Sequence, residues 1–246
     1  MKLTVIGPWG GYPKVNGASA GYLLEHKGFH LLVDCGSAVL SKLQQYIQPE
    51  LLDAVIISHY HPDHIADIGV LQHALIISKY MNKEIKTLPI YGHDENQHGF
   101  QLLFFDDVTK GVAYQEDQEI HIGPFKVSFL RTKHPVPCFA MRIEAENSVF
   151  VFTADSSYLE EFSSFAANAD ILLCESNFYG DMDGSAAGHM TSYEAGQIAQ
   201  AAQVKHLILT HLPQYGELEQ IKMEASEKFS GSIFLAEEGL SLDLSK

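Results

Sequence analysis

The stretch SHYHPDH occupies residues 58–64 and directly follows an apolar run of the chain. That run is rich in β-branched residues, which predicts a buried strand over residues 54–58. Side chains alternate along an extended segment, so His59 and His61 face the same side. Pro62 then ends the strand. Several imidazoles and a carboxylate at one strand end indicate a site organised by a cation.

The last two residues of the stretch, Asp63 and His64, open a predicted helix. They can therefore point at a second position close to the first, and two metal ions about 3.5–4 Å apart are what a shared hydroxide requires. Histidines outside such a pattern are more often ordinary core or surface residues. We give that interpretation to His26, His30, His73, His93, His98, His121 and His206.

The composition favours one folded domain over residues 1–246. Of these residues 46% are hydrophobic, which is enough for a core, and 31 acidic against 16 basic side chains give a net charge of −15. An acidic chain disfavours broad nucleic-acid binding. No apolar run approaches the ~20 residues that span a membrane, and we expect no membrane association. Cys35, Cys138 and Cys174 are odd in number and without a CxxC pair, which together with the lack of a secretory apolar region predicts a cytoplasmic protein.

The remaining pattern alternates strands and helices and predicts a layered α/β architecture of two sheets with helices outside. Strands are expected at residues 3–6, 21–24, 29–34, 88–92, 120–122, 125–132, 139–145, 148–153, 171–175, 206–210 and 232–235. Helices are expected at residues 37–47, 64–80, 95–105, 158–168, 192–202 and 218–229.

The motif His59-x-His61-x-Asp63-His64 resembles the signature of the metallo-β-lactamase superfamily of binuclear metal hydrolases. Further segments resemble the other family motifs in the expected order. They contain Asp34 (residues 32–36), His134 (132–137), Asp155 (152–156) and His211 (208–212). The resemblance implies a four-layer αββα sandwich with the site at one edge, between the sheets.

By this resemblance, one metal ion would bind His59, His61 and His134, and a second would bind Asp63, His64 and His211. Asp155 would bridge the two, and Asp34 would support the ligands without binding metal. Imidazole and carboxylate donors suit two Zn²⁺ ions, with Mn²⁺ or Fe²⁺ as alternatives. Taken singly, Asp155 could also cap a helix and His134 could be a loop residue.

Two further segments resemble the ribonuclease Z-like branch of the superfamily: residues 174–178, which contain Glu175, and residues 188–195, which contain His189. Residues 134–143 also resemble that branch's third motif. The family implies that His189 contacts the scissile phosphate and protonates the leaving oxygen. Glu175 would orient His189, although a purely structural role for it and a helix-flanking role for His189 stay open.

The implied reaction is phosphodiester hydrolysis by a hydroxide that bridges the metal ions, with Asp63 as a proton acceptor. Members that process transfer RNA carry a long arm, which in many cases lies between the third histidine and the bridging aspartate. In this chain two short predicted strands fill residues 134–155. RNA 3′-end processing therefore stands beside a smaller nucleotide or cyclic phosphodiester as the expected substrate.

An ester, thioester or lactone hydrolase of the same fold is the alternative enzyme, and its chemistry needs no phosphate-directed histidine. A non-catalytic binding protein is disfavoured because every ligand position is filled. Relatives in the branch are often dimers, so a homodimer is expected from the family alone.

Overall fold

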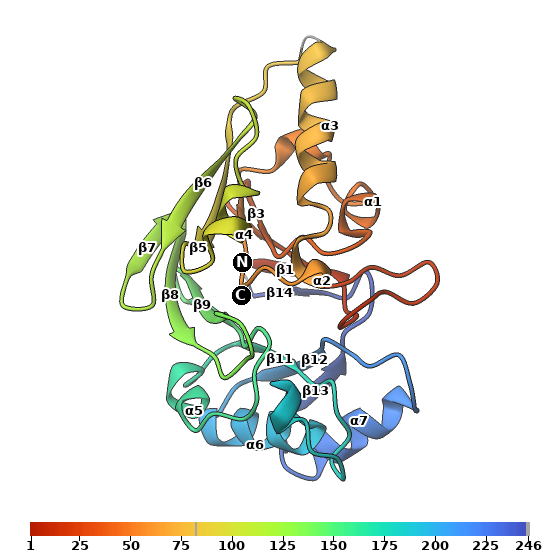
Figure 1. Ribbon diagram of the computed structural model, residues 1–246. Helices are drawn as coiled ribbons and strands as arrows, with labels where there is room; N and C mark the ends of the chain where they lie inside the picture. Colours follow the sequence, from red (N-terminus) through yellow and green to blue (C-terminus); the bar gives the residue numbers. More distant parts are fainter. Residues whose placement is uncertain (82, 245–246) are drawn as a thin grey trace. The chain divides into compact units, whose positions relative to one another are not determined.

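The computed structural model describes residues 1–81 and 83–244, and these form two compact units (Figure 1). Unit 1 comprises Met1–Gln115, Ile122–Pro124 and Glu237–Asp243. Unit 2 comprises Glu116–His121, Phe125–Ala236 and the last described residue, 244. Each unit carries one mixed sheet, and the α/β class predicted from the pattern is confirmed. The prediction of a single domain over residues 1–246 stays a prediction.

The sheet of unit 1 has the strand order β14-β1-β2-β3-β4-β5-β6. The first three strands along the chain pair antiparallel, and β3 to β6 pair parallel. Its strands are β1 Lys2–Gly7, β2 Gly21–His26, β3 Phe29–Val33, β4 Ala54–Ile56, β5 Leu88–His93, β6 Thr109–Tyr114 and β14 Ser241–Asp243. Strand β4 is completely buried, as its apolar run predicts.

Helices pack against this sheet because each of them offers an apolar face. Val39 and Leu43 of α1 and Leu71 and Leu75 of α3 are buried in one core with strand residues such as Val55. The helices of the unit are α1 Val39–Leu43, α2 Pro62–Ile65, α3 Ile68–Tyr80 and α4 Gln97–Gln101, with a 3₁₀ turn at Pro49–Leu51.

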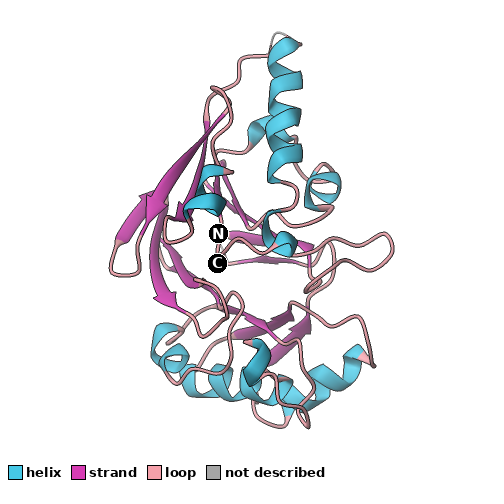
Figure 2. Cartoon of the chain, in the orientation of Figure 1, coloured by secondary structure: helices cyan, strands magenta, loops and turns pink. Residues whose placement is uncertain are grey.

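The sheet of unit 2 has the order β13-β12-β11-β10-β9-β8-β7. Strands β10 to β13 pair parallel, while β8, β9 and β10 pair antiparallel. The strands are β7 Glu119–Ile122, β8 Phe125–Arg131, β9 Phe139–Ala145, β10 Ser148–Phe152, β11 Ile171–Glu175, β12 His206–Thr210 and β13 Ser232–Leu235. Helices α5 Glu161–Phe165, α6 Ser192–Ala202 and α7 Leu218–Ser226 gather on one side of this sheet (Figure 2).

The predicted helix over residues 64–80 is wrong in one respect, because the structure breaks it into α2 and α3. The break has a tertiary cause. The carbonyl of His64 accepts from the N–H of Cys35, and the N–H of Asp67 donates to the carbonyl of Cys35. The Asp67 carboxylate also accepts from the N–H of Leu40 at 2.9 Å. These contacts use backbone groups that a continuous helix would need.

Other element predictions were wrong in length or missing. Helices α1, α4 and α5 are each shorter than the predicted helices over 37–47, 95–105 and 158–168. Strands β6 and β14 were not predicted from the sequence at all. Both are edge strands of this sheet and contain polar or glycine residues, so their sequences carry a weak strand signal. They form strands because they pair with the neighbouring strands β5 and β1.

Within the described residues, no helix combines the length and the apolar character needed to cross a membrane.

Candidate metal centre

The His59 cluster, defined as His59, His61, Asp63 and His64, lies where β4 ends and α2 begins. His61 has extended backbone angles and precedes α2, whose first residue is Pro62. Pro fits this position because its missing N–H has no partner in the first helical turn. His59 and His61 therefore lie in the segment before α2, and Asp63 and His64 lie in the first turn of α2, where the chain takes a new direction.

The side chains of the His59 cluster converge on one place. Nε2 of His59 lies 3.0 Å from Nδ1 of His61. The ring centroids of His59 and His64 are 4.2 Å apart, and Nε2 of His64 lies 3.4 Å from Oδ2 of Asp63. His59 and His64 are completely buried. Buried nitrogen and oxygen donors gathered in this way fit a borderline metal such as Zn²⁺.

Asp34 lies behind the His59 cluster, at the carboxyl end of β3. Its Oδ2 atom lies 2.7 Å from Nδ1 of His64. The backbone N–H of Ser58 donates to Oδ1 at 2.7 Å, and the Ser58 hydroxyl donates to Oδ2 at 2.8 Å. A carboxylate bound to Nδ1 sets the tautomer and aims Nε2 towards the metal position. Ser58 is a member of the site that the sequence interpretation missed, although it directly precedes His59.

Backbone contacts hold Asp63 as well. The N–H of Gly11 donates to its Oδ2 atom at 2.7 Å, a contact from a loop 52 residues earlier in the chain. A Cβ atom on Gly36 would lie 1.8 Å from the backbone oxygen of Asp63, so only glycine fits there. No sequence signal pointed to Gly11.

The Asp155 cluster, defined as His134, Asp155 and His211, lies in unit 2, where β8, β10 and β12 end. These strands run in the same direction, so their carboxyl ends meet at one edge of the sheet. Nε2 of His211 lies 3.3 Å from Oδ2 of Asp155, and Nε2 of His134 lies 4.0 Å from the same oxygen. The three side chains are almost completely buried.

The environment of His134 favours the neutral ligand form. Nδ1 of His134 lies 3.0 Å from the carbonyl oxygen of Gly188, so Nδ1 carries the proton and Nε2 faces Asp155. Burial lowers the pKa of His134, and the Asp155 charge and the Gly188 carbonyl offset this only in part. A neutral imidazole is the state that ligates a metal ion.

Glu175 and His189 lie beside the Asp155 cluster. Glu175 ends β11, is completely buried, and accepts from the N–H groups of Ser156 at 2.8 Å and Met190 at 3.1 Å. Its Oε1 atom lies 2.8 Å from Nδ1 of His189. The His189 ring stacks on His211 with centroids 5.2 Å apart, and its side chain keeps 17% of its surface exposed.

The structure thus collects the predicted residues of each unit into one local cluster. His59, His61, Asp63, His64 and Asp34 come together in unit 1, and His134, Asp155, His211, Glu175 and His189 come together in unit 2. The donors are imidazole nitrogens and carboxylate oxygens without a thiolate, a set that fits Zn²⁺, Mn²⁺ or Fe²⁺.

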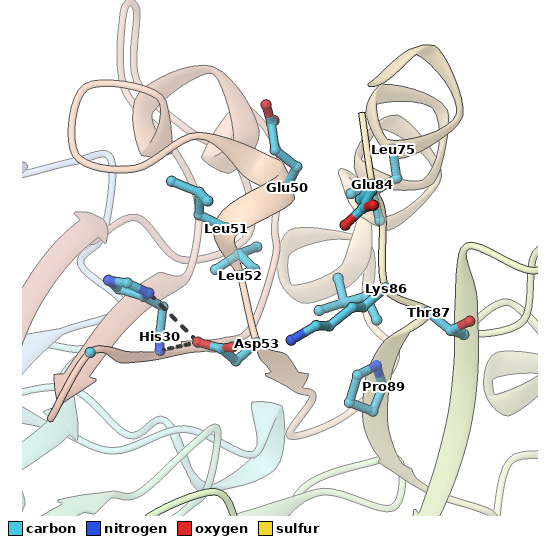
Figure 3. A pocket seen from close by; sticks show the side chains of 12 residues that line it. His30, Glu50, Leu51, Leu52, Asp53, Leu75, Glu84, Lys86, Thr87 and Pro89 are labelled. Carbon is cyan, nitrogen blue, oxygen red and sulfur yellow. Dashed lines mark hydrogen bonds and ion pairs between the residues drawn. The ribbon is translucent and has the colours of Figure 1, made fainter. Parts of the chain in front are cut away.

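A separate cavity of about 540 Å³ lies in unit 1, at the amino ends of β3, β4 and β5 (Figure 3). His30, Asp53 and Lys86 are among the residues that line it. The His59 cluster and Asp34 follow the carboxyl ends of β4 and β3, so this cavity is at the opposite ends of these strands and is not part of the candidate metal centre.

Comparison with known proteins identifies the family and the fold of this chain. Residues 30–212 match the family model described as Beta-lactamase superfamily domain. The chain is 52% identical over 239 residues to the probable metallo-hydrolase YhfI of Bacillus subtilis, covering 97% of this chain and 98% of that protein. The crystal structure of YhfI superposes with a TM-score of 0.95 over 98% of this chain and 99% of that chain.

More distant relatives are also similar over nearly the whole chain. Ribonuclease Z of Archaeoglobus fulgidus is 25% identical over 305 residues, covering 99% of this chain and 98% of that protein. A crystal structure described as a new diphosphatase from the PhnP family shares the fold, with a TM-score of 0.77 and 17% identity over 99% of this chain and 98% of that chain. The predicted fold is confirmed: this chain belongs to the β-lactamase superfamily, has the metallo-β-lactamase fold and is a metallo-hydrolase.

Proposed function

We propose that this protein is a binuclear, zinc-dependent phosphodiesterase acting on small phosphodiesters. The His59 cluster and the Asp155 cluster would together hold the two ions. His59, His61 and His134 would bind one ion, Asp63, His64 and His211 the other, and Asp155 both. Family membership and the donor atoms that each cluster presents support this assignment. When bound, such ions lower the pKa of a water molecule and offset the negative charge of phosphoryl oxygens.

The observation that carries the choice of phosphodiesters is the pair formed by Glu175 and His189. Oε1 of Glu175 lies 2.8 Å from Nδ1 of His189, so the carboxylate stabilises a second proton on the ring at Nε2. A partly exposed imidazolium held in this way can donate Nε2–H to a leaving oxygen. General-acid assistance of this kind contributes about 10²–10⁴-fold to a rate. Attack on an ester carbonyl needs no phosphate-directed histidine.

Asp63 has a second role in this proposal. Its carboxylate is held by the N–H of Gly11 and lies beside His64, so it can accept the proton of the attacking water without moving. The proton acceptor and the proton donor would then be two different residues, Asp63 of unit 1 and His189 of unit 2.

Small substrates are favoured over transfer RNA. Strands β9 and β10 occupy most of the interval between His134 and Asp155, and no arm is inserted there. The net charge of −15 also disfavours a long polyanion, whose binding needs many cationic contacts. The named activities of two relatives, ribonuclease Z and a diphosphatase, both concern phosphate esters or anhydrides and support the class of bond.

The test combines metal analysis with three substrates. Purified protein is expected to contain close to two transition-metal ions per chain, and to hydrolyse the phenyl ester of thymidine 5′-phosphate, a phosphodiester with a poor leaving group, until a chelator is added. His189→Ala should abolish most of that activity, whereas His73→Ala, an exposed histidine of α3, should not. Activity on a thioester or nitrocefin alone, unaffected by His189→Ala, would favour the carbonyl-ester alternative and refute this proposal.

We also propose a cytoplasmic location and a homodimer, both as family-level and compositional predictions. Fractionation of cells and light scattering of the purified protein measure them directly.

A further inference from the structure

The segment over residues 176–191 connects β11 to α6 in unit 2 and carries His189 near its end. We call the part that leaves β11, with Phe178 and Gly180, the outgoing arm, and the part that leads through Met190 into Ser192 of α6 the returning arm. Backbone hydrogen bonds join the two arms. The N–H of Phe178 donates to the carbonyl of Met190 at 3.2 Å, and the N–H of Ser192 donates to the carbonyl of Phe178 at 2.9 Å. The N–H of His189 donates to the carbonyl of Gly184 at 3.1 Å within the loop. The direction of the His189 ring therefore depends on how the two arms are held.

One side chain from outside the loop binds both arms. Glu224, on α7, accepts with Oε2 from the N–H of Gly180 at 2.8 Å, on the outgoing arm. The same oxygen accepts from the hydroxyl of Ser192, on the returning arm. Its other oxygen, Oε1, accepts from the side-chain amide of Gln220 at 2.7 Å. Gly180 and Ser192 lie 12 positions apart in the chain, and the carboxylate joins them at one point.

Glu224 is suited to hold this point rigidly. The residue is only 8% exposed, and it lies on a helix packed closely against α6. A Cβ atom on Gly196 of α6 would lie 2.6 Å from the backbone oxygen of Ala225, the residue after Glu224. Burial raises the pKa of Glu224, but the hydrogen bonds from Ser192, Gln220 and Gly180 together outweigh it, and the pKa lies below the usual value. The group is therefore a charged acceptor at neutral pH.

His189 lies on the returning arm, so its backbone position depends on where Glu224 holds Ser192. Ser192 is the first residue of α6, and Thr191 caps that helix through a reciprocal pair of hydrogen bonds with Glu194. His189 lies two residues before this cap. Its Nδ1 atom is bound by Glu175 at 2.8 Å on the other side. Glu175 thus orients the ring from the sheet, and Glu224 places the backbone that carries the ring.

We propose that Glu224 is a positioning residue for His189, a role that rests on the proposed function of His189 as general acid. Loss of the Glu224 carboxylate separates the two arms and displaces the imidazole from the leaving oxygen. A displacement of about 1 Å in a catalytic group costs on the order of 10²-fold in rate. The rate decreases at the step in which the leaving oxygen is protonated. The decrease is therefore larger for a poor leaving group than for a good one.

The experiment compares Glu224→Ala with three other variants. Glu224→Gln keeps an amide oxygen for Gly180 and Ser192 and should rescue most of the activity. Ser192→Ala removes one donor and leaves the carboxylate in place. Glu219→Ala, at an exposed acidic position of the same helix, is the matched control and should behave as wild type.

The first measurement does not depend on activity. Amide hydrogen exchange over residues 176–191 should be faster in Glu224→Ala by about tenfold or more, with exchange in β11 and β12 unchanged. If Glu224→Ala fails to fold, hydrogen exchange is measured on Ser192→Ala instead, where a smaller increase is expected. Unchanged exchange over 176–191 in a folded variant would overturn the proposal.

The second measurement uses the phenyl and p-nitrophenyl esters of thymidine 5′-phosphate, and p-nitrophenol is the better leaving group. Glu224→Ala should lower kcat by roughly 10–100-fold for the phenyl ester and by less than about threefold for the p-nitrophenyl ester. In a His189→Ala background, Glu224→Ala should have no further effect, because both variants remove the same contribution. Equal losses on both esters, additive with His189→Ala, would mean that Glu224 acts only on stability and would refute the inference.

Failure of the proposed function gives a different result. His189→Ala would then show no dependence on the leaving group, while hydrogen exchange would still report whether Glu224 holds the two arms.

Discussion

Oδ2 of Asp34 lies 2.7 Å from Nδ1 of His64, and both side chains are completely buried. The contact joins the end of β3 to the start of α2, and the Ser58 N–H and hydroxyl complete the coordination of the carboxylate. One buried group therefore supports a candidate metal ligand and the strand end that carries the other ligands of the His59 cluster.

Replacing Asp34 with Ala should weaken both stability and metal binding. The backbone N–H and hydroxyl of Ser58 and the Nδ1 group of His64 would lose a buried acceptor, at a cost of about 3–5 kcal/mol in the free energy of unfolding. Metal affinity should fall by about 10–100-fold because the His64 tautomer is no longer held. Urea unfolding and titration against a competing chelator measure the two effects. The control is Asp117→Ala at an exposed position, and equal metal affinity in both variants would contradict the prediction.

Gly36→Ala should disrupt the site through a steric clash. The added Cβ would lie 1.8 Å from the backbone oxygen of Asp63, so the start of α2 must shift. We expect lower stability and loss of metal binding. The control is Gly69→Ala in α3, where a Cβ meets nothing within 4 Å. There the helix should gain about 0.5–1 kcal/mol, since Ala is a better helix former than Gly. Similar behaviour of the two variants would argue against the clash.

The metal-free protein should lose stability as the pH falls through the range in which histidine becomes protonated. Burial lowers the pKa of His134 in the folded state below its value of 6.5 in the unfolded chain. The unfolded state therefore takes up a proton first, and the contribution of His134 to stability is complete above pH 6.5 and is lost as the pH decreases below it. Urea unfolding at several pH values should show a shallower dependence for His134→Gln than for wild type. Identical slopes would contradict this assignment.

Zinc should raise the melting temperature of the metal-free protein. At a free zinc concentration about 100-fold above Kd, binding adds about 2.7 kcal/mol to stability, which corresponds to an increase in Tm of roughly 5–10 °C for a chain of this size. Asp155→Ala should abolish most of the shift, because that carboxylate is expected to contact both ions. Glu160→Ala, at an exposed acidic position before α5, serves as the control. A full zinc shift in Asp155→Ala would contradict the shared-ligand assignment.

The His59 cluster could be predicted because its members lie within a short, local stretch. Alternation along an extended segment predicted that His59 and His61 face one side. The structure ends β4 at Ile56, short of the predicted strand over 54–58, but His61 keeps extended backbone angles before Pro62 opens α2 with Asp63 and His64. The strands that precede His134, Asp155 and His211 could also be located, since each is an apolar run. The resemblance then supplied the order of these residues, and the parallel strand pairing explains why their ends meet.

Other features depend on contacts between residues that are far apart in the sequence, and no local sequence pattern predicts them. The break between α2 and α3 exists because Asp67 and His64 bind backbone groups of residues 35 and 40. The hydrogen bond from Gly11 to Asp63 and those from Gly180 and Ser192 to Glu224 also join residues distant in the sequence.

The amino-acid sequence by itself determined the candidate ligands, the strands that carry them and the family of the fold, because these follow from short-range alternation and from an ordered set of motifs. Only the tertiary structure decided which backbone and carboxylate groups hold these candidate ligands in place. Those hydrogen bonds form between segments brought together by burial of the core, and a buried polar group is stable only where the folded chain supplies its partner.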